Sequence, residues 1–149
     1  MRNLLLVEDS DYKRTRISEF LSLNFSGLSV DVAVSFNSGA RLLDSKDYDV
    51  VLMDMSLPTF DITSTESGGR FRALGGRELA RRISRRGRSS RIVFVTQFNS
   101  FSDDVHSHSL KSLSDTLRED CGDLFAGVVY YDGAVAAWKD ELLDILSAL

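Results

Sequence analysis

The stretch YDVVLMDMSLP, residues 48–58, decides the fold. Its apolar run, Val50–Met53, is typical of a strand buried on both faces, as in a parallel sheet. A carboxylate, Asp54, follows directly, and the chain then turns toward Pro58. Taken alone, Asp54 is explained equally well as a turn residue or helix cap. The alternative is a reactive carboxylate at the mouth of a parallel sheet.

Similar runs recur along the chain and alternate with helical patterns. Apolar or alternating runs predict strands at residues 3–7, 28–34, 50–53, 92–95 and 128–131. Apolar residues at helical spacing predict helices at 10–24, 37–43, 76–86, 110–117 and 134–149. This alternation predicts an α/β fold, with a five-stranded parallel doubly wound sheet and helices on both faces.

Length and composition indicate a single domain. The 149 residues are enough for one full hydrophobic core, so we expect residues 1–149 to form one domain. An insertion at about 59–75, rich in Ser, Thr and Gly, and a long polar loop at about 99–109 interrupt the alternation. No apolar stretch approaches the length of a membrane span, so no membrane partner is expected. The one cysteine, Cys121, allows no internal disulfide, which favours the cytoplasm.

Charge is unevenly distributed along the chain. The formal net charge of −4 disfavours nucleic acid as a partner. Residues 70–91, however, contain nine arginines and one acid. We interpret the predicted arginine-rich helix first as a solvated face. Docking of an acidic protein partner is the second interpretation, and nucleic acid is the third.

Acidic residues follow the first and the third predicted strands. Glu8 and Asp9 follow the first strand, and Asp54 follows the third. If these strands are neighbours, as in the common strand order, the three acids converge at the switch point where ligands bind. Their mutual repulsion calls for a cation, and carboxylate oxygens suit Mg²⁺. Such a site is suited to phosphoryl transfer to an aspartate, with the hydroxyl of Thr96 close to the transferred group.

Short motifs at these strand ends resemble the receiver domain of two-component response regulators. They are VEDS at 7–10, DMSLP at 54–58 and VTQF at 95–98. The resemblance covers nearly the whole chain, and GGRELARRI at 75–83 is similar to the start of the family's third helix. It implies a flavodoxin-like, receiver-type fold.

The resemblance also implies a role for each candidate residue. Asp54 would be the phosphoacceptor. Asp9 would bind Mg²⁺ directly and Glu8 through water, with Asp54 and the backbone carbonyl of Ser56 completing the protein ligands. The hydroxyl of Thr96 would follow the phosphoryl group during switching.

One position departs from the family pattern. A lysine, often followed by proline, ends the last strand of the family and pairs with the phosphoryl group. Here the matching residue is Tyr131, or Tyr130 if the register shifts by one. A tyrosine donates a hydrogen bond but brings no positive charge. Either an arginine of the insertion, Arg70 or Arg72, replaces that lysine at the phosphate, or the protein does not use phosphoryl chemistry.

The favoured hypothesis is a stand-alone receiver that switches the binding of a partner when Asp54 is phosphorylated with Mg²⁺. It would not be an enzyme beyond catalysing its own phosphorylation. A sensor histidine kinase or phosphotransfer protein would act upstream and an unknown protein downstream, and the last strand and closing helix are a candidate homodimer face. The alternative is a pseudo-receiver that binds partners without phosphorylation. A Mg²⁺-dependent phosphatase-like enzyme is disfavoured, because Ser56 stands where it would need a second acid.

Overall fold

The central sheet has five parallel strands in the order β2-β1-β3-β6-β7. The structure, a computed structural model, describes residues 1–62, 65, 67–69, 71–72, 74–97 and 110–149. The sheet strands are β1 (Asn3–Val7), β2 (Ser29–Ala33), β3 (Val50–Met53), β6 (Arg91–Thr96) and β7 (Phe125–Tyr130). The predicted five-stranded, doubly wound α/β sheet is confirmed.

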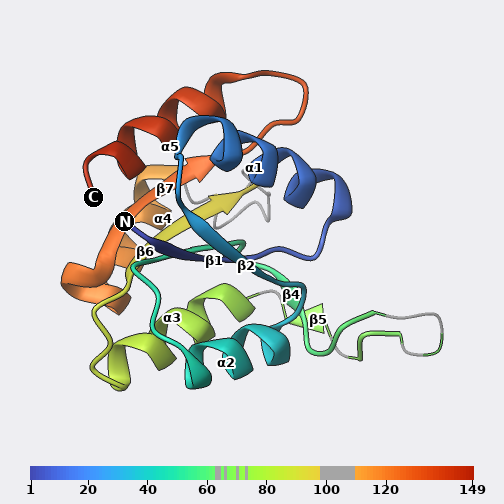
Figure 1. The fold of residues 1–149 in the computed structure, drawn as a ribbon. Helices are drawn as coiled ribbons and strands as arrows, with labels where there is room; N and C mark the ends of the chain where they lie inside the picture. The colour runs from blue at the N-terminus through green and yellow to red at the C-terminus, as the bar shows by residue number, and fades with distance from the viewer. Residues whose placement is uncertain (63–64, 66, 70, 73, 98–109) are drawn as a thin grey trace.

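Helices cover both faces of this sheet (Figure 1). On one face lie α1 (Asp11–Asn24) and α5 (Ala137–Ser147), and on the other lie α2 (Phe36–Ser45), α3 (Gly75–Arg85) and α4 (Leu110–Cys121). A short 3₁₀ turn, Gly122–Leu124, leads from α4 into β7. The sheet is therefore the middle layer of three, with a separate hydrophobic core on each side.

The central strands are apolar throughout because both of their faces are covered. Successive side chains alternate between the two cores, as the pleat of a strand requires. In β1, Leu4 packs under α1 and α5, whereas Leu5 packs under α2, α3 and α4. In β3, Val50 and Val51 divide in the same way, and all four are at most 1% exposed.

The order of the strands places the ends of β1 and β3 side by side. The two strands pair in register from Leu4 with Val50 to Val7 with Met53. The chain order reverses at this point, since β2 lies on one side of β1 and β3 on the other. The residues that follow β1 and β3 therefore share one edge of the sheet, at the switch point where such folds bind ligands.

The predicted insertion is part of a hairpin that the sequence pattern did not reveal and whose first strand precedes residue 59. Strands β4 (Leu57–Pro58) and β5 (Phe71–Arg72) pair in an antiparallel manner at its base. An isolated bridge joins Ile62 to Ser67 farther out, and the segment projects from the body of the protein (Figure 1). Strands of two residues carry no periodicity, which explains why none was predicted. The predicted polar loop at 99–109 lies outside the described residues.

The last strand also differs from its prediction. It begins at Phe125, three residues earlier than expected, and ends at Tyr130. Gly127 interrupts the apolar pattern there, and a glycine weakens the strand signal. A Cβ at Gly127 would lie 2.8 Å from the Cδ1 of Ile145 in α5, so a larger residue here would require the end of that side chain to shift.

The structure also bears on the question of a membrane span. Within the described ranges, no helix is both long enough and apolar enough to cross a bilayer.

Candidate functional site

The three predicted acids meet at the carboxyl edge of the sheet. Glu8 and Asp9 directly follow β1, and Asp54 directly follows β3. Backbone hydrogen bonds continue the strand pairing into this region, from the N–H of Glu8 to Ala33 (2.9 Å) and from that of Asp54 to Val7 (3.3 Å). Each of the three acids offers a carboxylate oxygen within 4.8 Å of the others. The predicted convergence of the carboxylates is therefore observed.

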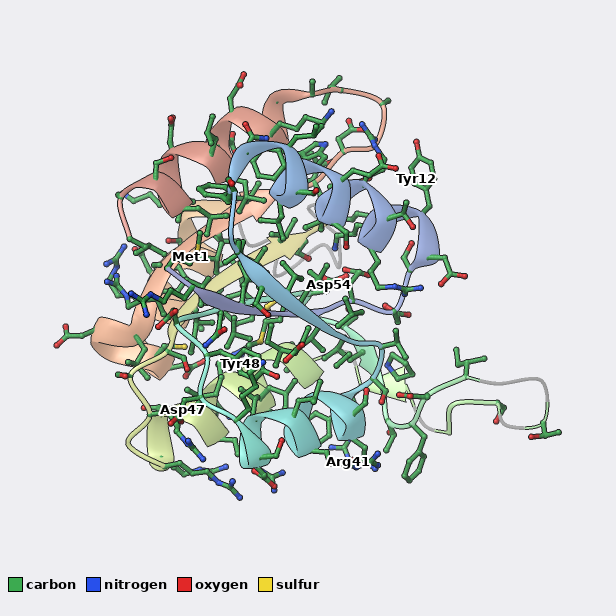
Figure 2. The ribbon with its side chains drawn as sticks, viewed as in Figure 1. Met1, Tyr12, Arg41, Asp47, Tyr48 and Asp54 are labelled. Atoms are coloured by element: carbon green, nitrogen blue, oxygen red, sulfur yellow. The ribbon has the colours of Figure 1, made fainter. Side chains whose placement is uncertain are left out.

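The two oxygens of Asp54 have different partners. Oδ1 accepts a hydrogen bond from the backbone N–H of Met55 at 2.7 Å, and Oδ2 accepts one from the ammonium of Lys13 at 3.1 Å. The Asp54 side chain remains 15% exposed, and it lies beside the sheet below α1 (Figure 2). Asp54 is thus held in one orientation but is still accessible from solvent.

Lys13 is a member of this site that the sequence reasoning missed. Its Nζ lies 2.7 Å from Oε2 of Glu8 and 3.1 Å from Oδ2 of Asp54, and it donates to the carbonyl of Val95 at 2.6 Å. The residue is only 1% exposed. Its neighbour Tyr12 points away from the sheet into solvent (Figure 2). The ammonium is therefore buried among two acids and one carbonyl.

The start of α1 explains how Lys13 reaches the acids. Ser10 is the N-cap of α1, and its hydroxyl accepts a hydrogen bond from the backbone N–H of Lys13. Lys13 shares the buried side of α1 with Ile17 and Leu21, at spacings of four residues. A lysine in an apolar helical stripe was the available sequence signal, because a buried ammonium requires acidic partners.

Burial changes the protonation of the paired acids. Desolvation raises the pKa of Glu8 to about 7, even though the ammonium of Lys13 opposes the shift, and the charge of Asp54 adds to it. The pKa of Asp9 is also raised, first by desolvation and less by Asp54. Anions crowded into a partly desolvated pocket favour proton or cation binding.

The charges and atoms of the pocket fit a divalent cation. When all three carboxylates are ionised, the ammonium of Lys13 leaves two negative charges uncompensated. Oxygen ligands of this kind suit Mg²⁺. Glu8, Asp9 and Asp54 would supply the carboxylates, and Ser56 lies half-buried in the turn that follows Asp54.

Two further predicted residues lie at the ends of the neighbouring strands. Thr96 ends β6, is 5% exposed, and its carbonyl accepts a hydrogen bond from the N–H of Tyr131 at 2.8 Å. Tyr131 is 1% exposed and packs against Trp138 with ring centroids 5.2 Å apart. Its ring centroid lies 5.5 Å from Nζ of Lys13, whereas Tyr130 is 39% exposed. Tyr131 is therefore the tyrosine that borders the pocket.

Of the two arginines proposed as lysine substitutes, the structure describes Arg72, and its recorded partners do not include Asp54. Arg72 forms an ion pair with Glu78 at 2.7 Å, and its guanidinium lies 4.3 Å from the ring centroid of Phe36. Arg70 lies outside the described residues. The structure brings Lys13, from a different element, to the phosphoacceptor candidate.

The arginine-rich helix α3 forms ion pairs with its neighbouring helices. Arg77 and Arg81 both pair with Asp120 of α4, at 2.6 and 3.2 Å, and Arg86, the C-cap residue of α3, pairs with Asp44 of α2. The Asp120 side chain is only 14% exposed. At least part of the arginine cluster therefore stabilises the packing of α2, α3 and α4.

Sequence comparisons find relatives that span the chain. The uncharacterized protein y4jR of Sinorhizobium fredii is 28% identical over 140 residues, which cover 93% of this chain and 92% of the relative. The Detocs response regulatory protein DtcB of Enterobacter cloacae is 26% identical over 151 residues, which cover 98% and 99%.

Solved structures show the same fold. The signal receiver domain of an HD domain-containing protein from Pseudomonas fluorescens Pf-5 has a TM-score of 0.65 at 19% identity, covering 99% of this chain and 92% of the other. The chemotaxis response regulator CheY4 of Vibrio cholerae has a TM-score of 0.65 at 17% identity, covering 99% and 98%. The family model of the response regulator receiver domain matches residues 4–117. The chain therefore belongs to the response regulator receiver domain family.

Proposed function

We propose that this receiver domain is phosphorylated on Asp54 in a Mg²⁺-dependent reaction and that phosphorylation switches the binding of a partner protein. One observation carries the proposal. Asp54 lies at the carboxyl end of β3, and one of its carboxylate oxygens lies within 4.8 Å of a carboxylate oxygen of both Glu8 and Asp9. Its side chain is held by Met55 and Lys13 and is still accessible to a donor. A structural turn residue has no need of two further acids beside it.

The protein's own contribution to the reaction is positioning and charge. A carboxylate oxygen of Asp54 forms a bond to phosphorus while the bond from phosphorus to the donor breaks. The electron pair of the broken bond leaves with the donor group, which then takes a proton from solvent. Mg²⁺, when bound by Glu8 and Asp9, would neutralise charge on the transferred group. The protein would thus act as a phosphoryl acceptor and not as an enzyme with turnover on other substrates.

The proposal also assigns partners and a compartment. The phosphodonor would be a sensor histidine kinase or a phosphotransfer protein, which supplies the histidine. A downstream protein would bind the phosphorylated and unphosphorylated states with different affinities, since only differential binding can make a switch. We place this exchange in the cytoplasm, in line with the free thiol of Cys121.

The test is phosphorylation by a small phosphodonor such as phosphoramidate, read by intact mass with and without Mg²⁺. Wild type should gain one phosphoryl group with Mg²⁺ and lose most of that gain when the metal is chelated. Asp54→Asn should gain none. Asp11→Asn is the matched control, because it removes an exposed carboxylate two residues beyond Asp9.

The second candidate function, a pseudo-receiver, makes the opposite prediction. No added mass on wild type, beside a known receiver that is modified in the same tube, would refute the proposal and favour constitutive binding. The departure that motivates this candidate is Tyr131, which supplies no cation at the end of β7.

A further inference from the structure

The pocket needs a cation of its own once Asp54 is modified. A bound phosphoryl group carries about 1.5–2 negative charges near neutral pH, and here it would join the carboxylates of Glu8 and Asp9. A divalent ion offsets only part of that charge. A buried anion without sufficient compensation is costly in a low-dielectric site.

The residue at the end of the last strand cannot provide this charge. Tyr131 is neutral, is 1% exposed and packs against Trp138. Its hydroxyl lies 3.4 Å from Nη1 of Arg16, and this arginine also donates to the carbonyl of Gly133 at 2.7 Å. The ring of Tyr131 thus forms part of the core between α1 and α5.

We propose that Lys13 of α1 is the phosphoryl-binding cation of this receiver, in place of a lysine at the end of the last strand. This inference rests on the proposed phosphorylation of Asp54. The ammonium already contacts Oδ2 of Asp54 and Oε2 of Glu8, and its third hydrogen bond goes to the carbonyl of Val95. The ring of Tyr131 lies beside it.

The proposed movement is small. When an Asp54 oxygen bonds to phosphorus, the ammonium exchanges its hydrogen bond to Oδ2 for one to a phosphoryl oxygen. The bonds to Glu8 and Val95 hold Lys13 in place during this exchange. Lys13 keeps all three of its protons, so it stabilises charge and transfers none. A charge-assisted hydrogen bond from a buried ammonium stabilises the transferred group strongly.

The same position has a consequence for metal binding. Nζ contacts oxygens of Glu8 and Asp54, two of the carboxylates that would bind Mg²⁺. Removal of the ammonium therefore leaves a more negative pocket, which binds a divalent cation more tightly. Loss of Lys13 should thus weaken phosphoryl binding and strengthen Mg²⁺ binding. General damage to the fold would weaken both.

The experiment compares wild type with Lys13→Met, with Lys13→Met/Tyr131→Lys and with Arg16→Met. Methionine keeps most of the length of the side chain without its charge, and the double variant places a lysine after the end of β7. Arg16→Met is the matched control. Arg16 is also a cation of α1, but its guanidinium contacts Gly133 and Tyr131 and not Asp54. Three quantities are measured: the phosphorylation rate with phosphoramidate, the affinity for beryllofluoride by ¹⁹F NMR, and the affinity for Mg²⁺ alone by calorimetry.

The proposal expects Lys13→Met to lower the phosphorylation rate and beryllofluoride affinity at least about tenfold while Mg²⁺ affinity rises. Arg16→Met should stay within about twofold of wild type. Recovery of the rate in the double variant supports the proposal directly.

The outcomes separate this inference from the proposed function. If wild type is phosphorylated and Lys13→Met reacts as fast as Arg16→Met, the role of Lys13 is overturned but the proposed phosphorylation of Asp54 stands. Wild type that neither gains a phosphoryl group nor binds beryllofluoride overturns both. Thermal melts confirm that each variant is folded, and Lys13→Gln is read in the same way if Lys13→Met does not fold.

Discussion

Replacing Gly76 with alanine should disrupt the turn that carries Asp54. Gly76 is the second residue of α3, and its N–H donates to the carbonyl of Met55 at 2.9 Å. A Cβ on Gly76 would lie 2.0 Å from the carbonyl oxygen of Asp54 and 3.1 Å from Cα of Met55. Real Cβ atoms essentially never approach other atoms closer than 3.0 Å, and backbone cannot rotate away as a side chain does.

The loss in unfolding free energy can be estimated from the movement that Gly76→Ala requires. Helix α3 and the Asp54 turn have to separate by about 1 Å or more, and overpacking of this kind costs about 1–3 kcal/mol. The same movement breaks the hydrogen bond from Gly76 to Met55, and leaving buried backbone groups unpaired costs about 1–3 kcal/mol more. The better helix propensity of alanine returns about 1 kcal/mol. We therefore expect a loss of about 3 kcal/mol in unfolding free energy, or roughly 10 °C in Tm.

The assay is thermal and urea unfolding, with phosphorylation by phosphoramidate measured on the folded fraction. Gly133→Ala is the control, because a Cβ there comes no closer than 3.5 Å to any atom and should change stability by less than about 0.5 kcal/mol. Phosphorylation of Gly76→Ala should also slow, since the clash displaces the backbone of Asp54 itself. A Gly76→Ala protein that melts within about 2 °C of Gly133→Ala would refute the reasoning.

Three further predictions concern buried or partly buried ionisable groups. Burial raises the pKa of the Cys121 thiol to about 11, so iodoacetamide at pH 8 should label the native protein far more slowly than the unfolded one, and equal rates would contradict this. The folded-state pKa of Glu8, about 7 against 4.5, means that metal-free stability falls as pH rises from about 4.5 to 7, by up to about 3 kcal/mol. In Glu8→Gln, the unfolding free energy measured by urea titration should depend less on pH over this range. An unchanged pH dependence would assign the decline to other groups. Asp120→Asn should lower unfolding free energy by about 1–2 kcal/mol, because it weakens the pairing with both Arg77 and Arg81. A double-mutant cycle with Arg77→Gln should show coupling, and additive effects would argue against the pair.

Much of the fold could be predicted because the signal was continuous. The run Val50–Met53 is apolar at every position, since both faces of β3 are covered, and the strand was predicted with its observed bounds. The last strand was predicted three residues late because Gly127 breaks the apolar pattern. The hairpin of β4 and β5 was missed because its strands have two residues each. The errors therefore fall where the local pattern is interrupted or too short to show a period.

The site shows the same division between local and tertiary information. Glu8, Asp9 and Asp54 could be brought together from the sequence, because parallel strands end at one edge and the common strand order makes their strands neighbours. Lys13 could not be placed in this way, since it belongs to a helix and reaches the site across the sheet edge. Arg70 and Arg72 were predicted as replacement cations because they lie near Asp54 in the sequence. Arg72 instead pairs with Glu78, and Arg70 lies outside the described residues.

A physical signal for Lys13 was nevertheless present in the helix itself. A lysine at the same spacing as Ile17 and Leu21 must either leave the apolar stripe or find anionic partners in the core. Tyr131 makes the second outcome favourable, because its ring fills the core beside Trp138 and borders the ammonium. Tyr131 and Lys13 thus form one arrangement. The residue after β7 carries no positive charge, and the cation that contacts Asp54 comes from α1. An atypical residue at a strand end is therefore a reason to examine the buried stripe of the adjacent helix for the missing cation.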